Sequence, residues 1–174
     1  MAWQVDSAHT QIAFGIRHLG ISLIRGNMRL AEADLDLDEN NPENARLRAK
    51  IDVGTLDTRD ANRDGHLKGP DFFNVAQYPY IEFVTKSVRD KGNGKFEVTG
   101  DLTIKDVTGE ILLNGEYGGP VNDPVSGKRK VGFLMTGDIP KDEFGVTWNV
   151  PMEDNRFMLA QSVSVTIDAQ AIES

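Results

Sequence analysis

Apolar and polar residues alternate along most of this chain, in runs separated by glycine, asparagine, aspartate and proline. In residues 11–18, Ile12, Phe14 and Ile16 fall on one face, and polar or small residues fall on the other. A period of two indicates a half-buried β-strand. The pattern recurs and predicts eight strands, over residues 11–18, 28–37, 46–56, 81–89, 95–104, 110–117, 129–139 and 162–169.

Most of these strands follow one another through short turns. Asn93 and Gly94 supply the positive φ angles of a tight hairpin, so we expect the strands on either side to be antiparallel. Residues 118–128 are rich in glycine and proline and predict a loose loop. The sequence offers no helices to cover the apolar face of an open sheet of eight amphipathic strands. The simplest arrangement is a closed sheet, which buries that face inside and leaves no exposed edge. The sequence predicts an all-β fold, an eight-stranded antiparallel β-barrel, with a β-sandwich as the alternative.

Residues 57–83, between the third and fourth strands, do not alternate. Charged residues at positions 59, 60, 63 and 64 have the spacing of neighbours on a helix. We expect a short helix that begins near Thr58 and is capped by Asp57 or Thr58. Gly69 and Pro70 end it, because proline has no amide donor and disfavours the α region in the residue before it.

Aromatic residues follow this helix at a density unusual for a solvated loop: Phe72, Phe73, Tyr78 and Tyr80. We therefore expect residues 57–83 to cover one end of the barrel. The aromatic side chains either line a cavity there or simply plug that end.

Composition narrows the class of protein. A formal charge of −8 disfavours nucleic acid and anionic membrane surfaces as partners. The absence of cysteine excludes disulfides and thiolate chemistry, and no apolar run of about eighteen residues predicts a membrane-spanning helix. The first ten residues lack the basic and apolar regions of an export signal, so we expect a cytoplasmic protein, or a periplasmic one if a leader has been removed. Residues 1–174 are expected to form one domain.

Four segments carry a family resemblance: VDSAHTQIAFGIRHLG, TRDANRDGHLKGPDFFNVAQYPYIEF, GDLTIKDVTGEI and DEFGV. Together they span nearly the whole chain, and they resemble the YceI-like family of lipocalin-like proteins, which is associated with polyisoprenoid binding. The pattern RD-x-HL, followed by DFF, a tyrosine–proline pair and an apolar strand, makes the resemblance specific. Asp106 stands where the family often has glycine, and Lys141 where it often has arginine.

The resemblance implies a lipocalin-like barrel whose elongated apolar pocket binds a long-chain isoprenoid lipid, such as an isoprenoid quinone or a polyprenyl lipid, without a demonstrated reaction. We expect no cofactor and no metal. Inward-facing residues of the predicted strands would make its interior: Phe14, Ile16, Phe83, Phe133 and Met135. His18, Arg59 and Asp60 are candidates to contact the lipid headgroup, although charged residues of this kind are also common on solvated faces. Four further aromatic residues are candidates to line the ligand: Phe72, Phe73, Phe144 and Trp148. Phe144 and Trp148 are equally compatible with an interface in a homodimer.

The sequence gives weaker support for a catalytic site or a metal site. Asp60 and Asp64 resemble a catalytic carboxylate pair, but neighbouring arginines would keep both ionised. The three histidines lack the spacing of a metal motif, and Asp6, Ser7 and His9 lack a nucleophile elbow. Two alternative functions remain open. One is a small-molecule enzyme that uses His18 inside the barrel, and the other is a structural or partner-binding barrel with a filled interior.

Overall fold

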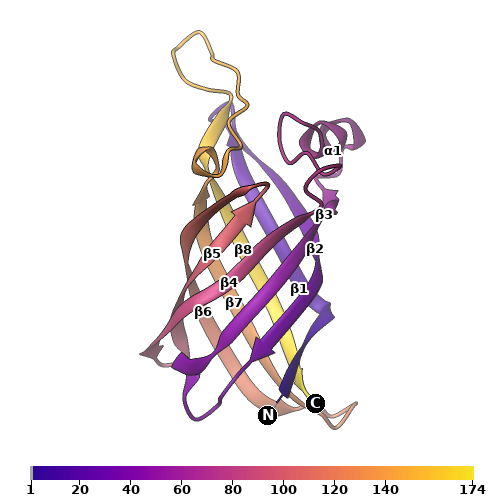
Figure 1. Cartoon of the computed structure of the whole chain (residues 1–174), viewed down its shortest axis with the longest axis vertical. Helices are drawn as coiled ribbons and strands as arrows, with labels where there is room; N and C mark the ends of the chain where they lie inside the picture. The colour runs from indigo at the N-terminus through magenta and orange to yellow at the C-terminus, as the bar shows by residue number, and fades with distance from the viewer. Residues whose placement is uncertain (1) are drawn as a thin grey trace.

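The eight strands form a closed antiparallel barrel in the computed structural model of the chain, which describes residues 2–174 (Figure 1). Each strand pairs with the next along the chain, and the last pairs with the first, so the sheet has no open edge. The predicted all-β barrel is confirmed, and the sandwich is excluded. The strands are β1 (Ala2–His18), β2 (Ser22–Asp36), β3 (Arg46–Asp57), β4 (Tyr80–Gly92), β5 (Lys95–Ile104), β6 (Val107–Asn122), β7 (Arg129–Pro140) and β8 (Leu159–Glu173).

Three short helices lie in the connections: 3-10 helices η1 (Pro42–Asn44) and η2 (Lys141–Phe144), and α-helix α1 (Ala61–Lys68). None of the helices within residues 2–174 is long and apolar enough to cross a lipid bilayer.

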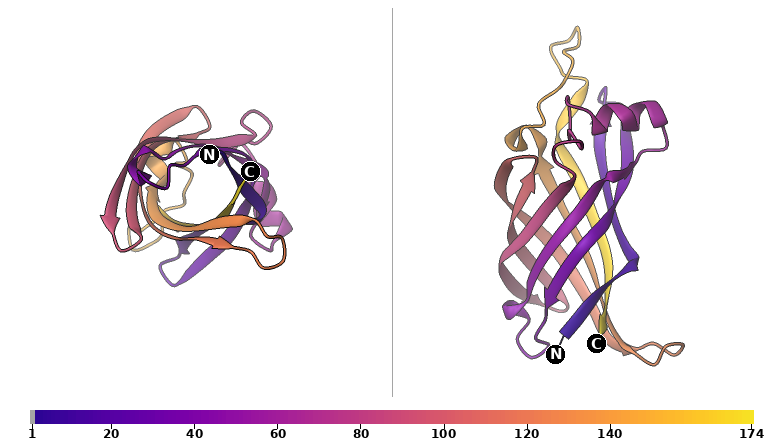
Figure 2. Two further views of the ribbon diagram at one scale, coloured as in Figure 1. Left: turned by 90° about the horizontal axis from the view of Figure 1, so that it is seen from below. Right: turned by 45° about the vertical axis from the view of Figure 1, so that its right-hand side comes forward.

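The two ends of the barrel differ (Figures 1 and 2). The end that we call lower carries both termini, and the amide of Ser174 donates to the carbonyl of Ala2 at 3.0 Å. The end that we call upper carries α1, η2, the turn between β1 and β2, and a long connection that leads into β8.

Strand β1 begins at Ala2 and not at residue 11, so the predicted start was wrong. The Asp6 carboxylate accepts from the amide of Ala8 at 3.0 Å, and its other oxygen lies 2.7 Å from His9 Nδ1. The hydroxyl of Thr10 donates to the Asp6 carbonyl. The register of β1 shifts against both neighbouring strands in this stretch, and the resulting bulge hides the period of two.

Strand β6 is also longer than predicted. Residues 118–122, which we expected to belong to a loop, continue the strand to Asn122. The register against β7 shifts between Gly118 and Val121, which accommodates a proline that cannot donate to the ladder. Only residues 123–128 form the turn.

Helix α1 confirms the expected helix between β3 and β4, but the predicted start and cap were wrong. Asp60 is the N-cap, and its side chain accepts from the amides of Asn62 and Arg63. Asp57 instead accepts from the amide of Arg59, which has a positive φ of 66°. The cap is therefore displaced toward the C-terminus, and Gly69 ends the helix as expected.

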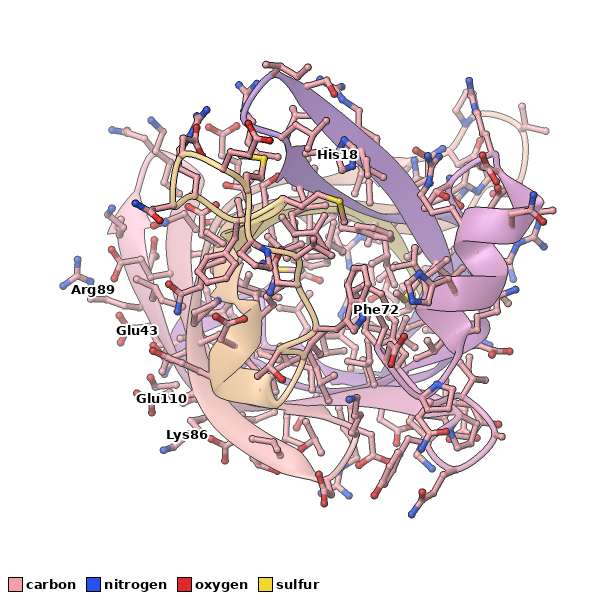
Figure 3. The ribbon with its side chains drawn as sticks, turned by 90° about the horizontal axis from the view of Figure 1, so that it is seen from above. His18, Glu43, Phe72, Lys86, Arg89 and Glu110 are labelled. Carbon is pink, nitrogen blue, oxygen red and sulfur yellow. The ribbon has the colours of Figure 1, made fainter. Side chains whose placement is uncertain are left out.

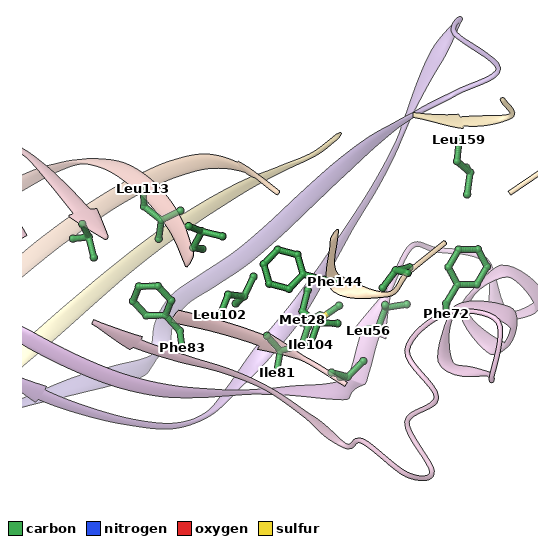
Figure 4. Packing of buried hydrophobic residues seen from close by; sticks show 14 of the residues in the cluster. Met28, Leu56, Phe72, Ile81, Phe83, Leu102, Ile104, Leu113, Phe144 and Leu159 are labelled. Atoms are coloured by element: carbon green, nitrogen blue, oxygen red, sulfur yellow. The ribbon is translucent and has the colours of Figure 1, made fainter. Parts of the chain in front are cut away.

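The apolar faces of the strands point inward and form the main buried cluster (Figure 4). Phe83 of β4 and Leu102 of β5 are direct neighbours across the sheet, and both are buried. A smaller cluster of Trp3, Val131 and Ala171 lies where β1, β7 and β8 meet toward the lower end. Burial of these faces stabilises the wall of the barrel.

Candidate ligand-binding cavity

The interior of the barrel is hollow. A cavity of about 650 Å³ is lined by residues of all eight strands, of α1 and of the connection before β8. The lining includes Trp148 from the upper end and Pro42 from the lower end, so the cavity extends along the barrel. Its volume lies within the range of about 300–1,000 Å³ typical of ligand pockets. Figure 3 looks into the lumen from the upper end.

The cavity is long as well as apolar. Strand β8 lines the cavity from Leu159 to Ala169, and at about 3.3 Å per residue this stretch measures about 35 Å along the strand. Most side chains along the wall are aliphatic or aromatic, including Ile111, Phe133 and Val165. Polar side chains of the lining lie mainly near the two ends. This arrangement suits a ligand with an extended apolar part.

Glycines in the wall make room for phenylalanine rings. Phe14 and Gly26 face each other on β1 and β2, and a Cβ atom on Gly26 would lie 2.6 Å from the Phe14 ring. Phe96 and Gly115 have the same relationship on β5 and β6, where the ring occupies the position of the missing side chain. Each ring lies against the neighbouring strand and therefore leaves the centre of the lumen free.

Helix α1 is fixed to the upper end through Thr58, which is 3% exposed. The Thr58 hydroxyl donates to the Asp64 carboxylate and accepts from Arg63 Nε at 2.8 Å, and Arg63 Nη2 donates to the Thr58 carbonyl at 2.6 Å. Both charged partners come from α1, whereas Thr58 follows β3. The network holds Arg63 and the helix at the edge of the cavity, which Arg63 lines.

Three rings connect α1 to the connection before β8. The ring centroid of His66 lies 5.0 Å from that of Phe72 and 4.8 Å from that of Trp148, both edge to face, and Phe72 and Trp148 are 5.2 Å apart. His66 Nε2 also lies 2.9 Å from a carboxylate oxygen of Asp71. All three rings line the cavity. They form an aromatic closure across the upper end.

Lys141 places a positive charge in the cavity wall although the residue is only 5% exposed. Its Nζ donates to Asp142 at 2.7 Å and to the carbonyl of Val146 at 3.3 Å. A buried ammonium requires such partners, because desolvation of an unpaired charge is costly. Lys141 and Arg63 are therefore two fixed cations at the upper end of an apolar cavity.

The lower end is held by Arg129. Its guanidinium donates to Glu39 at 2.9 Å and to Glu173 at 2.9 Å, and it lies 6.0 Å from the Trp3 ring. The hydrogen bond to Glu39 is the main cause that raises the pKa of Arg129 above its ordinary value. These contacts tie the connection after β2 to the C-terminal strand. Glu39, Arg46 and Tyr117 line the cavity nearby.

Most residues that the sequence singled out lie along this cavity. Nine of the predicted residues line it: Phe14, Ile16, His18, Phe72, Phe73, Phe83, Phe133, Met135 and Trp148. Figure 3 labels His18 and Phe72, which come from different sides of the upper opening. Their contact with a ligand stays a prediction.

Arg59, Asp60 and Phe144, which were also predicted as ligand contacts, do not line the cavity, and their contact with a ligand stays a prediction. Asp60 is used as the helix cap, and Arg59 is exposed before it. Phe144 is buried beside Gly109, where a Cβ atom would lie 3.0 Å from its ring. Tyr78 and Tyr80 are also absent from the lining, and Tyr80 is exposed on the outer surface.

Several lining residues were not predicted as ligand contacts. Phe96, His66 and Lys141 received no role at the cavity from the sequence. Lys141 was visible in the sequence as a departure from the family pattern. His9, His18 and His66 do not come together, and residues 2–174 contain no group of three or more side chains suited to a metal.

Comparison with known proteins places residues 3–171 in a match to the YceI-like domain. A UPF0312 protein of Staphylococcus epidermidis is 32% identical over 165 residues, which cover 95% of this chain and 94% of the relative. The structure of the YceI protein of Campylobacter jejuni is 31% identical, with a TM-score of 0.77, and the match covers 91% of this chain and 90% of that one.

A more distant structure shares the fold. A polyisoprenoid binding domain from Saccharophagus degradans, implicated in plant cell wall breakdown, is 13% identical, with a TM-score of 0.69. The match covers 100% of this chain and 99% of that domain. The closed barrel is thus found across sequences that have diverged widely.

Proposed function

Because the chain belongs to the YceI-like family, we propose that its barrel binds a long-chain isoprenoid lipid of the polyprenyl or isoprenoid-quinone type. The observation that carries this proposal is the apolar cavity of about 650 Å³ that extends along the barrel. Each methylene group buried there contributes about 0.8 kcal/mol, so several isoprene units bind without polar contacts to the tail. The name of the Saccharophagus degradans domain supports the same class of ligand.

The polar part of the lipid is proposed to lie at the upper end. Arg63 and Lys141 line the cavity there and carry donors toward oxygen acceptors, such as quinone carbonyls or a phosphate. Arg63 uses Nε and Nη2 to bind Thr58, which leaves Nη1 free of that network. The tail then runs down the barrel past Phe83 and Phe96.

The role proposed for the protein is carriage, storage or sequestration of this lipid. The alternative of a structural barrel requires an interior filled by side chains, whereas this interior contains a cavity of about 650 Å³. An enzyme in the same cavity would depend on His18, and no side chain within residues 2–174 hydrogen-bonds its ring to orient it as an acid or base. Binding without a reaction therefore fits these residues better.

The first experiment asks whether the protein carries a lipid when it is purified without detergent. Denatured protein is extracted with organic solvent, and the extract is analysed by mass spectrometry. We expect an isoprenoid species close to one per chain.

A titration gives an independent test on emptied protein. Trp148 lines the cavity and Trp3 does not, so the Trp3→Phe variant reports on the cavity alone. Ubiquinone in detergent should quench Trp148 fluorescence saturably, and a polyprenyl alcohol should reverse the quenching. An empty extract together with no saturable quenching would overturn the proposed function.

A further inference from the structure

Exposed apolar side chains gather at the upper end of the barrel. The turn between β1 and β2 exposes Leu19, Ile21 and Leu23, and Ile21 is 78% exposed. The connection before β8 exposes Val150 and Phe157, and Phe157 is 59% exposed. We call these five residues the apolar rim. Exposed apolar patches on a protein surface commonly mark interaction sites.

The two segments that carry the apolar rim are joined by backbone hydrogen bonds. The amide of Leu19 donates to the carbonyl of Met158 at 2.7 Å, and the amide of Met158 donates to the carbonyl of Val150 at 2.8 Å. Phe157 also forms a β-bridge with Pro151. Backbone hydrogen bonds therefore hold the turn and the connection together, and both segments lie at the same end of the barrel (Figure 1).

The rim adjoins the opening of the cavity. His18 precedes Leu19, Ile24 follows Leu23 and Met158 follows Phe157, and all three of these neighbours line the cavity. Leu23 and Ile24 are successive residues of β2 and point to opposite sides, so Leu23 faces outward beside a residue that lines the cavity. A lipid tail that leaves the cavity at this end passes directly beside the rim.

Positive charge accompanies the rim although the whole chain carries −8. Arg17 and Arg25 are exposed on the outer face of the β1–β2 hairpin, where Arg17 is the register partner of Leu23. Neither arginine forms an ion pair within the part of the chain that the structure describes. Residues 17–25 contain no carboxylate. The connection carries Glu153 and Asp154, of which Asp154 is paired with Arg156, so the three arginines of the two segments outnumber their two carboxylates.

We infer that the apolar rim docks on the surface of an anionic lipid bilayer, from which the cavity takes up its lipid. Ile21 and Phe157 reach into the boundary between headgroups and acyl chains, and Arg17 and Arg25 bind lipid phosphates. Shallow insertion of apolar side chains with basic neighbours is how proteins lie on such interfaces. Docking is reversible, because the patch is small and the rest of the surface is acidic. The inference rests on the proposed function, since the lipid in the cavity supplies the reason to meet a membrane.

The test uses vesicles of phosphatidylcholine with 30 mol% phosphatidylglycerol that contain ubiquinone. Uptake is followed by quenching of Trp148 in the Trp3→Phe background, and docking by flotation of the protein with the vesicles. The test variant combines Ile21→Asp and Phe157→Asp, which places carboxylates in the rim. The matched control is Val125→Asp at the lower end, where the valine is 94% exposed. All variants are also titrated with ubiquinone in detergent, which needs no membrane.

We expect the double variant to lose flotation and to take up ubiquinone from vesicles at least tenfold more slowly than the parent. The Val125→Asp protein should keep the parent rate, and all proteins should bind detergent-dispersed ubiquinone equally. Uptake should also fall when phosphatidylglycerol is omitted.

An unchanged rate in the double variant, or an equal loss in Val125→Asp, would overturn the docking site. So would a dimer of the parent, detected by light scattering, that the double variant abolishes, because the rim would then bind a second copy. Failure of the parent to bind ubiquinone and a polyprenyl alcohol in detergent is a different result. It would overturn the proposed function, and the docking inference with it.

Discussion

The ring of Phe96 occupies the space in which a side chain of Gly115 would stand. The two residues are direct partners on β5 and β6, and the ring lies on the inner wall of the barrel. Because glycine has no Cβ atom, the ring packs against the neighbouring backbone and does not cross the lumen. The space that the cavity has at Phe96 therefore depends on the absence of a Cβ atom at Gly115.

Replacement of Gly115 by alanine should push the Phe96 ring into the lumen. We expect a loss of stability of about 1–3 kcal/mol from overpacking, and a preference for shorter isoprenoids. Binding of polyprenyl alcohols of increasing length, measured by competition with ubiquinone, checks this. The Gly118→Ala control lies on the same strand, meets nothing within 4 Å and should change neither quantity. The Phe96 ring does not limit the cavity if Gly115→Ala prefers isoprenoids of the same length as the parent does. The same conclusion follows if adding Phe96→Ala to Gly115→Ala does not restore the parent's preference.

Removal of the Thr58 hydroxyl should loosen the attachment of α1 to the barrel. Thr58→Val removes the hydroxyl that the Asp64 carboxylate and Arg63 Nε share, at a cost of about 1–3 kcal/mol, while the Thr58 amide still donates to Asp64 and its carbonyl still accepts from Arg63 Nη2. We expect faster hydrogen exchange at the α1 amides, with little change in β5 and β6. Thr103→Val is the control, because that hydroxyl is exposed and pairs only with Thr108. Equal exchange rates in the two variants would contradict the anchoring role of Thr58.

The aromatic closure should slow release of the ligand. Trp148→Ala removes edge-to-face contact with His66 and contact with Phe72, each worth about 0.5–1.5 kcal/mol. Dissociation of a radiolabelled polyprenyl alcohol into excess detergent should accelerate about tenfold, since about 1.4 kcal/mol corresponds to that factor. Trp148→Phe should show a smaller effect, and Trp3→Phe none. A Trp148→Ala protein that releases the lipid at the parent rate would exclude a gating role.

The stability that the turn between β6 and β7 contributes to the fold should depend on pH, because Asp123 in this turn is ionisable. The hydrogen bond from Lys130 Nζ, with a 2.7 Å separation, and the bond from the amide of Val125 hold the pKa of this carboxyl well below its ordinary value. The pair therefore stabilises the fold above the ordinary pKa of aspartate, near 4, and this contribution is lost as the pH falls through the lower folded-state pKa.

Carbon-13 NMR titration of the Asp123 carboxyl measures this effect. We expect the Lys130→Met variant to move the midpoint upward toward the ordinary value. Asp154, whose pKa is lowered mainly by the Arg156 amide, serves as the internal reference and should not move. If the titration midpoint of Asp123 is the same in the parent and in Lys130→Met, the hydrogen bond from Lys130 does not lower the pKa of Asp123.

The sequence predicted the wall of the barrel well, because a period of two is a direct record of which side chains face inward. It placed Phe14 and Phe133 on the inner face, and Asn93 and Gly94 adopt the positive φ angles expected of their hairpin. It failed where a side chain binds the backbone nearby. Asp6 interrupts the alternation of β1 in this way, and Asp60 shifts the start of α1.

The ends of the cavity were harder to predict for a related reason. Helical spacing grouped Arg59 with Arg63, but only the contact between Arg63 and Thr58 decides which of them reaches the cavity. The period-of-two pattern places Phe144 and Trp148 on the same face, yet Phe144 packs beside Gly109 and Trp148 contacts α1. Both outcomes depend on contacts between segments far apart in the chain, which a local pattern does not record.

The pairing of β1 with β8 has a consequence for biosynthesis. These strands exchange hydrogen bonds across nearly the whole length of the chain, from Trp3 with Glu173 to His18 with Leu159. A sheet of the other seven strands alone would have two free edges, because the barrel closes only through β1 and β8. We therefore expect the closed cavity to form only after β8 has been synthesised, so that a ligand would enter it after that point.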